Sequence, residues 1–419
     1  MTKLQKLVAS VVATGSILAS AALPLFAQTT IVISDNGAGS DNSAVVTQAT
    51  TTVVTQSNTA NVTNDVDADA ETGDNDANFN TGGDVTISTG NAEVTAVVTN
   101  ELNSNAAEVE CCPTGPVDVE ISGNGAFSDN QVQLVLTNVT TLNQGNKANV
   151  YNDVEVEAET GENDANLNTG GDVTIMTGKA KASAVVSTHA NENWASIAPA
   201  LGSGGSSSVS LKILDNGAGS SNWIQAALSK VTTLNQTNYA YVKNEVEAEA
   251  ESGENEANFN TGGDVLIDTG DAEVGVVVDN DVNFNWAALD CGCAWGLFAK
   301  IEGNGADPEH QENGPDNGIL ASLTSVQTAG QGNQAKLYNE LDDEELEADT
   351  GDNEAKLNTG EGEGDPSILT GDATVNVGVS NSGNVNQIGG ALPLPWPLPP
   401  VEFNFNWAGF WAFFGLLLG

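Results

Sequence analysis

The chain has 419 residues, of which 57 are acidic and 11 basic, so its formal net charge at pH 7 is -46. All 11 basic residues are lysine; arginine, the usual bidentate ligand of phosphate and carboxylate groups, is absent. This charge repels DNA, RNA and anionic lipid, which excludes nucleic-acid binding and leaves cations and basic surfaces as the natural counterparts.

Residues 1–27 have the pattern of a secretory signal peptide. Lys3 and Lys6 form a basic start, the stretch from Leu7 to Leu23 is largely apolar, and Ala27 ends a small-residue cleavage site. The alternative, a retained membrane anchor, is disfavoured because Ser, Thr and Gly interrupt the apolar stretch. We therefore expect a mature chain that begins near Gln28 and is secreted or held at the cell surface.

An outer repeat of about 90 residues follows. Its two markers are Asn-Gly-Ala, which begins at Asn36, Asn124, Asn216 and Asn304, and Asn-Thr-Gly, which begins at Asn80, Asn168, Asn260 and Asn358. The markers define repeat units at 28–113, 114–205, 206–300 and 301–390, followed by a Pro-rich linker and hydrophobic tail at 391–419.

An inner period of about 16 residues runs inside each unit. In the first unit it is marked by Ala44, Ala60, Ala77, Ala92 and Ala107. One such period has room for a short strand, a turn, a second short strand and a second turn, which together make one coil of a β-solenoid. We therefore predict an all-β fold, a parallel β-solenoid of ~16-residue coils in four ~90-residue units. About 20 coils spaced by about 4.8 Å would give a rod on the order of 95 Å long, with its axis across the strands.

Alternation within one such winding predicts which side chains face the core. Ala77, Phe79, Val85 and Ile87 fall on one side, with a glycine turn at 80–83 between them, and the alternating polar residues fall on the other side. The alternative fold, tandem β-sandwich domains, accounts for the outer period and not for the inner one.

These repeats carry a family resemblance. The segments Asn166 to Ile175 and Asn143 to Val150 resemble uncharacterised exported Asn/Thr/Gly-rich repeat proteins of candidate-phyla bacteria. The Gln-x-x-Asn-x-Ala pattern, which begins at Gln56, Gln144, Gln236 and Gln331, is also similar to the repeats of curlin-type β-solenoid surface proteins, although the coil expected here is shorter. The resemblance implies a surface or matrix role.

Each of the first three units contains a strand in which acidic and apolar residues alternate, so four carboxylates share one outer face. The twelve residues are Asp65, Asp67, Asp69, Glu71, Asp153, Glu155, Glu157, Glu159, Glu245, Glu247, Glu249 and Glu251. One interpretation is a solvated edge that keeps the protein soluble; the other is a loose Ca²⁺ site, because Ca²⁺ takes six to eight oxygen ligands. Asp and Glu exchange between units, which disfavours a ligand cage of fixed geometry.

The four cysteines, Cys111, Cys112, Cys291 and Cys293, lie between outer units and are candidates for disulfides. With 16-residue coils the two pairs would lie about ten coils, or on the order of 50 Å, apart. That distance excludes one disulfide or a shared zinc site joining the pairs, and leaves local disulfides or links between molecules.

No catalytic constellation is recognisable, since His189 and His310, the only histidines, lack counterparts in the other units. We therefore expect a protein that is not an enzyme.

The motif Asn-x-Asn-Trp-Ala contains Trp194, Trp286 and Trp407, whose indoles would either stack on sugars or cover the end of the core.

The sequence thus predicts an exported, non-enzymatic structural protein of the cell surface or extracellular matrix, such as an adhesin or a subunit of a layer or fibre. The alternative is a surface module that binds Ca²⁺ or carbohydrate.

In the tail, the apolar stretch from Ala408 to Gly419 is shorter than the ~20 residues of a spanning helix. We expect the tail to dock on the cell envelope or on other subunits, and homo-assembly is compatible with this role.

Overall fold

The computed structural model describes residues 3–13, 19–21, 29–110, 116–198, 206–290, 294–305, 317–341, 346–360 and 366–389. These residues form strands and turns and contain no helix. Two strands, β1 (Lys3–Ala13) and β2 (Ala19–Ala21), precede the repeats. The predicted tail at 391–419 and all four cysteines lie outside the described residues, as do His310 and Trp407.

One coil of the fold consists of one short, one very long, one short and one intermediate strand. In the first coil these are β3 (Thr29–Ser34), β4 (Asp41–Glu71), β5 (Val85–Ser88) and β6 (Ala92–Glu110). The second coil contains β7 (Val117–Ser122), β8 (Asp129–Glu159), β9 (Val173–Met176) and β10 (Ala180–Ala198). The third contains β11 (Ser206–Leu214), β12 (Ser221–Glu251), β13 (Val265–Asp268) and β14 (Ala272–Leu289). The fourth contains β15 (Ala294–Glu302), β16 (Asn317–Glu340), β17 (Leu346–Asp349), β18 (Ser367–Leu369) and β19 (Ala373–Ile388).

Each strand pairs in parallel with the equivalent strand of the next coil. The four resulting sheets have the orders β16-β12-β8-β4, β18-β13-β9-β5, β19-β14-β10-β6-β1 and β15-β11-β7-β3, with β2 also on β6 and β17 also on β12. The predicted all-β, parallel β-solenoid is therefore confirmed.

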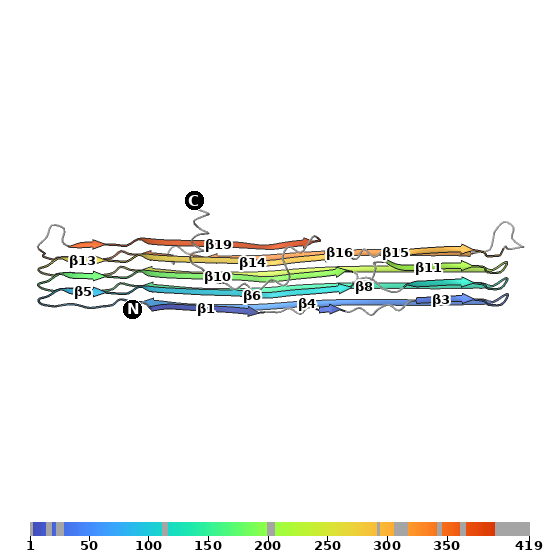
Figure 1. The fold of residues 1–419 in the computed structure, drawn as a ribbon, viewed down its shortest axis with the longest axis horizontal. Helices are drawn as coiled ribbons and strands as arrows, with labels where there is room; N and C mark the ends of the chain where they lie inside the picture. Colours follow the sequence, from blue (N-terminus) through green and yellow to red (C-terminus); the bar gives the residue numbers. More distant parts are fainter. Residues whose placement is uncertain are drawn as a thin grey trace.

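The predicted coil length of ~16 residues is wrong, because a coil is a whole outer unit. Asn42 bonds to Asn130, 88 residues along the chain, and Asn130 bonds to Asn222, 92 residues further on. The long axis consequently runs along the strands and not across them (Figure 1). A strand of 31 residues such as β4 spans about 100 Å at roughly 3.3 Å per residue, whereas four stacked coils add only about 5 Å each.

The inner period marks core positions along one coil. Ala44 and Ala60 lie on the same strand, β4, and an even separation keeps both on the inner face. Ala92 and Ala107 lie on β6, where their odd separation is accommodated by a bulge at Asn103, whose φ is 57°. The equivalent Asn191 and Asn283 have φ values of 68° and 65°, so the bulge recurs in every stacked strand.

The coils enclose a narrow core between two layers. One layer is the long sheet of β4, β8, β12 and β16, and the other is the row of three shorter sheets. At one end, Val66 and Ala70 of β4 pack with Ala92 and Val94 of β6. The same arrangement continues toward the other end, where strands equivalent to β3 cover the start of the long strands.

Rows of asparagine also lie inside the core, contrary to the prediction that the polar residues of each winding face outward. Asn64 Nδ2 donates across the layers to Asn100 Oδ1 at 2.9 Å and along the stack to Asn152 Oδ1 at 2.6 Å, with all three side chains buried. Because these amides pair with their copies in adjacent coils and with the facing layer, the side chains of Asn100 and Asn152 both donate and accept hydrogen bonds inside the core without water. The ladders therefore bond the coils together and the two layers to each other.

The predicted glycine turn at 80–83 is present, with positive φ at Gly82 and Gly83. Phe79, however, is 74% exposed and not part of the core, because its φ of 62° breaks the alternation of an extended strand. At the neighbouring turn Gly161 approaches the next coil so closely that an added Cβ would lie 1.9 Å from Gly253 O. Only glycine allows the coils to stack at strand spacing there.

Candidate functional site

The acidic strands stand side by side and form one surface, the carboxylate face. Asp65, Asp67, Asp69 and Glu71 are exposed on the outer side of β4. Each aligns in register with an acidic residue of the next two coils: Asp65, Asp153 and Glu245; Asp67, Glu155 and Glu247; Asp69, Glu157 and Glu249; Glu71, Glu159 and Glu251. Glu340, Glu347 and Asp349 extend three of these rows into the fourth coil. The twelve candidate residues therefore form a grid with spacings of about 4.8 Å across the strands and about 6.6 Å along them.

Like charges this close oppose ionisation. Partial burial, and after it the neighbouring carboxylates Glu162, Glu71 and Glu157, raises the pKa of Glu159 to about 7. Burial and the charges of Glu254 and Glu159 likewise raise the pKa of Glu251 to about 7. The pKa of Glu157 is raised for the same reasons. Near neutral pH this end of the grid therefore holds protons or attracts cations.

The grid contains few basic residues. At one margin of the face, Lys243 forms ion pairs with two of the carboxylates: its Nζ lies 2.9 Å from Glu245 and 2.8 Å from Glu340. Glu155, Glu157, Glu247, Glu249 and Glu347 line a shallow hollow. Yet nowhere in the described ranges do three or more His, Cys, Asp or Glu side chains form a group that could hold a metal ion. The predicted Ca²⁺ site stays a prediction.

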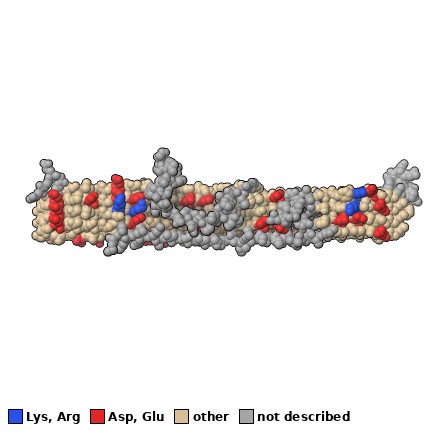
Figure 2. All heavy atoms as spheres, viewed as in Figure 1, with Lys and Arg blue, Asp and Glu red and all other residues tan. Residues whose placement is uncertain are grey.

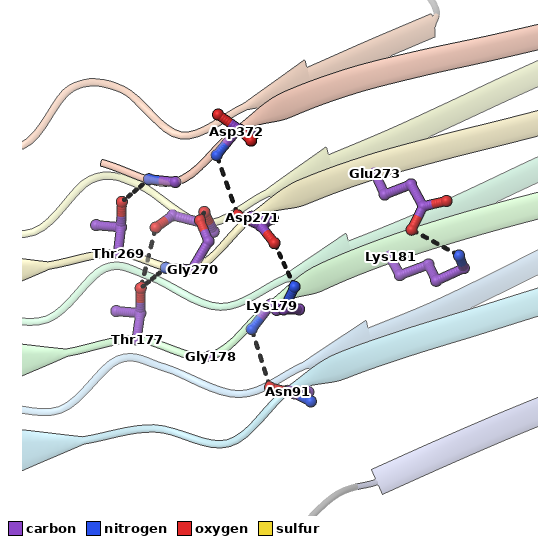
Figure 3. A network of polar contacts seen from close by, with 12 residues as sticks. Asn91, Thr177, Gly178, Lys179, Lys181, Thr269, Gly270, Asp271, Glu273 and Asp372 are labelled. Carbon is purple, nitrogen blue, oxygen red and sulfur yellow. Dashed lines mark hydrogen bonds and ion pairs between the residues drawn. The ribbon is translucent and has the colours of Figure 1, made fainter. Parts of the chain in front are cut away.

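The opposite layer shows a different charge arrangement. Figure 2 shows lysines lying beside acidic side chains on the face that it presents. Figure 3 shows one such place, where β9 and β13 lead into β10 and β14: the second coil supplies Lys179 and Lys181, and the third supplies Asp271 and Glu273. Lys181 Nζ lies 2.7 Å from Glu273, so charge is balanced locally there.

His189 is held between two carboxylates. Its Nδ1 lies 3.4 Å from Asp281 and its Nε2 lies 2.7 Å from Glu192. Hydrogen bonds to Asp281 and Glu192 raise the pKa of His189 to about 10, so the imidazole is protonated and ion-paired at neutral pH. A histidine in this state is no general base.

The aromatic motif lies inward where it is described. Trp194 and Trp286 are each 6% exposed, and their ring centroids are 5.9 Å apart in a cluster with Ala106. Neither indole offers an open face on which a sugar could stack. Both serve the core, as one of the two interpretations of the motif predicts.

The separation of about 50 Å predicted between the two cysteine pairs assumed a 16-residue coil, which the structure does not have. The cysteines follow β6 and β14, which belong to the first and third coils and are separated in the sheet by β10 alone. Two strand spacings amount to about 9.6 Å, and not to 50 Å, between the ends of these strands.

The structural feature that the sequence interpretation missed is the set of buried amide ladders. Asn58, Asn146, Asn238 and Asn333 occupy the same position in every coil, and Asn146 Nδ2 donates to Asn193 Oδ1 at 3.0 Å in the opposite layer. Identical asparagines at identical positions of all four units were the available signal. A sequence rule that considers one strand at a time does not predict from this signal that the asparagines are buried.

Comparison with known proteins adds no relative: no family model, curated protein or solved structure matches the chain. In the part of the chain that the structure describes, there is also no helix long and apolar enough to cross a membrane.

The carboxylate face predicts an unusual dependence of stability on pH. Glu159 and Glu251 have pKa values of about 7 in the folded protein against 4.5 for an unperturbed glutamate, so between these two pH values the folded state binds more protons than the unfolded state. The free energy of unfolding should therefore fall as pH rises from about 4.5 to 7.

We expect Glu159→Gln combined with Glu251→Gln to raise the melting temperature at pH 8, by the equivalent of about 1 kcal/mol after allowance for solvent screening, and to leave it nearly unchanged at pH 5. The matched control replaces Asp41 and Asp129, a stacked and exposed pair, with Asn. Equal shifts for both pairs, or a shift that persists at pH 5, would contradict the account of the grid.

Proposed function

We propose that this chain is an exported, non-enzymatic structural protein of the cell surface or extracellular matrix. The observation that carries the proposal is the repeated coil: the paired strands of four equivalent units serve to stack one unit on the next. The described interior is occupied by core residues and amide ladders. A thin bar on the order of 100 Å long, with a strongly acidic surface, suits a structural element at a surface better than an enclosed active site.

The first test of this function is the fate of the full chain in an export-competent bacterial host. We expect a mature N-terminus near Gln28, determined by mass spectrometry, and protein that is accessible to external protease on intact cells or recovered from the medium. An uncleaved chain that stays protected inside the cell would overturn the proposal.

Truncation after Gly390 tests how the protein is held at the surface. Residues 391–419 contain Trp411 and several phenylalanines, and buried apolar surface contributes about 25 cal/mol per Å². We expect the truncated chain to appear in the medium with the melting temperature of the full chain. If it stays on the cells, the attachment lies within the repeats.

A second candidate function is loose cation binding by the carboxylate face, favoured by the in-register stacking of its rows. If Ca²⁺ binds there, millimolar Ca²⁺ should stabilise the fold by about 1–3 kcal/mol beyond the effect of NaCl at matched ionic strength. Replacing Asp67, Asp69 and Glu71 with Asn, Asn and Gln should remove the first coil's share. An equal response to Na⁺, Mg²⁺ and Ca²⁺ would leave a solvated acidic edge.

A further inference from the structure

In the described part of the chain, the top of the stack, formed by β15, β16, β17, β18 and β19, leaves the core open. Val375 and Val377 of β19 are each 43% exposed. Their register partners one coil below, Val274 and Val276, are at most 1% exposed. A terminal repeat that ended the stack would be expected to cover such positions with polar side chains. The described edge of the fourth coil instead presents the same inward valines as the coils beneath it.

The bottom of the stack is open along the long sheet. Val46 of β4 is only partly buried, whereas Leu134, its partner in β8, is fully buried. In the sheet of β6, the described strands at the bottom edge are β1 and β2, which pair with β6 at Lys3–Ala13 and Ala19–Ala21. Both strands lie within the predicted signal peptide, so its removal would leave β3, β4, β5 and β6 as a continuous open edge (Figure 1).

The amide ladders give these two edges opposite polarity. Asn42 Nδ2 donates to Asn130 Oδ1, and Asn130 Nδ2 donates to Asn222 Oδ1, each at 2.8 Å, before the ladder ends at Asn317. Among the described residues, Asn42 Oδ1 accepts no hydrogen bond and Asn317 Nδ2 donates none. The bottom edge therefore offers an acceptor where the top edge offers a donor.

Another ladder repeats this complementarity. The ladder from Asn75 through Asn163 to Asn255 runs in the same direction. A top edge matches a bottom edge in both of these asparagine ladders, whereas two equal edges would set donor against donor and acceptor against acceptor.

We propose that, once residues 1–27 are removed, a second copy of this chain places its first coil on the fourth coil of the first copy, and that repetition of this joint builds a ribbon. The joint continues the interface already present between coils: β16 pairs with β4 of the next copy, β19 with β6, β15 with β3, and β18 with β5. A joint of this kind is heterologous and does not close, so it propagates.

The ribbon would be on the order of 100 Å wide and would lengthen by about 19 Å per chain, or four strand spacings. The carboxylate face would continue along its length, so the net charge of each chain, -48 once Lys3 and Lys6 are removed from the full chain's -46, opposes growth until salt or protons reduce it. This inference rests on the proposed export, because cleavage opens the bottom edge.

The first experiment compares residues 28–419 with the full chain 1–419 at pH 5.5 and pH 8 in 0.15 M salt, by electron microscopy and fibre diffraction. We expect ribbons from residues 28–419, favoured at pH 5.5, with a reflection of about 4.8 Å along the ribbon axis. The full chain should assemble at least tenfold less. Mature chain that stays monomeric at high concentration overturns the inference, and if it is still found at the cell surface the proposed function stands.

The second experiment blocks one edge at a time. Val377→Lys places a charge on the top edge and Val46→Lys places one on the bottom edge; both sites are partly exposed in a single chain, so the lysines reach solvent until a joint forms. The controls, Thr374→Lys and Val45→Lys, put the same charge on the outer faces of the same strands. Circular dichroism checks folding, and Val379→Lys and Ala44→Lys replace any variant that fails to fold.

We expect each edge variant alone to be monomeric by light scattering, their equimolar mixture to form a dimer with one intact joint, and both controls to assemble. Ribbons that form in spite of both edge substitutions would overturn the inference, because assembly would then use another surface. A dimer of either edge variant by itself would overturn it as well, since equal edges would be pairing.

Discussion

Replacing Asn193 with alanine is expected to lower the free energy of unfolding by about 3–5 kcal/mol. Asn193 is fully buried; its Nδ2 donates to Asn238 Oδ1 at 2.7 Å and to Asn285 Oδ1 at 2.9 Å. Its Oδ1 accepts from Asn105 and Asn146 at 2.9 and 3.0 Å. Alanine would leave these partners short of hydrogen bonds in a core that water does not enter, and would open a small cavity.

The matched control is Asn149→Ala, which removes an asparagine from an outer ladder. Asn149 Nδ2 donates to Asn61 Oδ1 at 2.7 Å on the exposed face, where water can replace the lost bond. Its loss should cost less than about 0.5 kcal/mol. Urea denaturation at concentrations where the mature chain is monomeric measures both values. Similar losses for the two variants would show that the buried ladders add nothing beyond ordinary strand pairing.

The sequence was sufficient to predict parallel strands, stacked coils, the glycine turn at 80–83 and the outward direction of the acidic side chains. Alternation identifies two faces of a strand, and repetition identifies equivalent strands, so both follow from local pattern. The solvent-exposed side of Asp65 to Glu71 follows from the same alternation. Their stacking in register with the next units did not follow, because register depends on which unit neighbours which.

The coil length could not be read from the inner period, because a short repeat of core alanines fits a short coil and a long strand equally well. The deciding signal was the absence of turn residues: the stretch from Asp41 to Glu71 contains neither glycine nor proline. The burial of the asparagines was missed for a related reason. A side chain such as Asn64 counts as polar in one strand, and only pairing with Asn152 and Asn100 makes its burial favourable.

Phe79 shows the limit of periodicity at the ends of a coil. Its apolar side chain and its place two residues after Ala77 predict an inward position. The equivalent Leu167 and Phe259 also have positive φ and are exposed, so this conformation belongs to the turn and not to one residue. Alternation predicts facing only while the backbone stays extended.

The central claim, that one outer unit is one coil whose strands lie along the long axis, is tested by deleting Asn124 to Asp215, which are 92 residues and one full coil. The deletion joins Gly123 to Asn216, so each residue is followed by the neighbour that its equivalents have in the other units. Each coil contacts only its neighbours, so the shortened chain should fold, with a lower melting temperature because one stacking interface is lost.

Small-angle X-ray scattering of the monomeric deletion variant and of the parent decides the matter. The account predicts that the maximum dimension of the particle stays the same, on the order of 100 Å, while its mass falls and its cross-section loses one strand spacing of about 4.8 Å. A maximum dimension shortened by about a quarter, with an unchanged cross-section, would contradict it, because coils would then be stacked along the long axis.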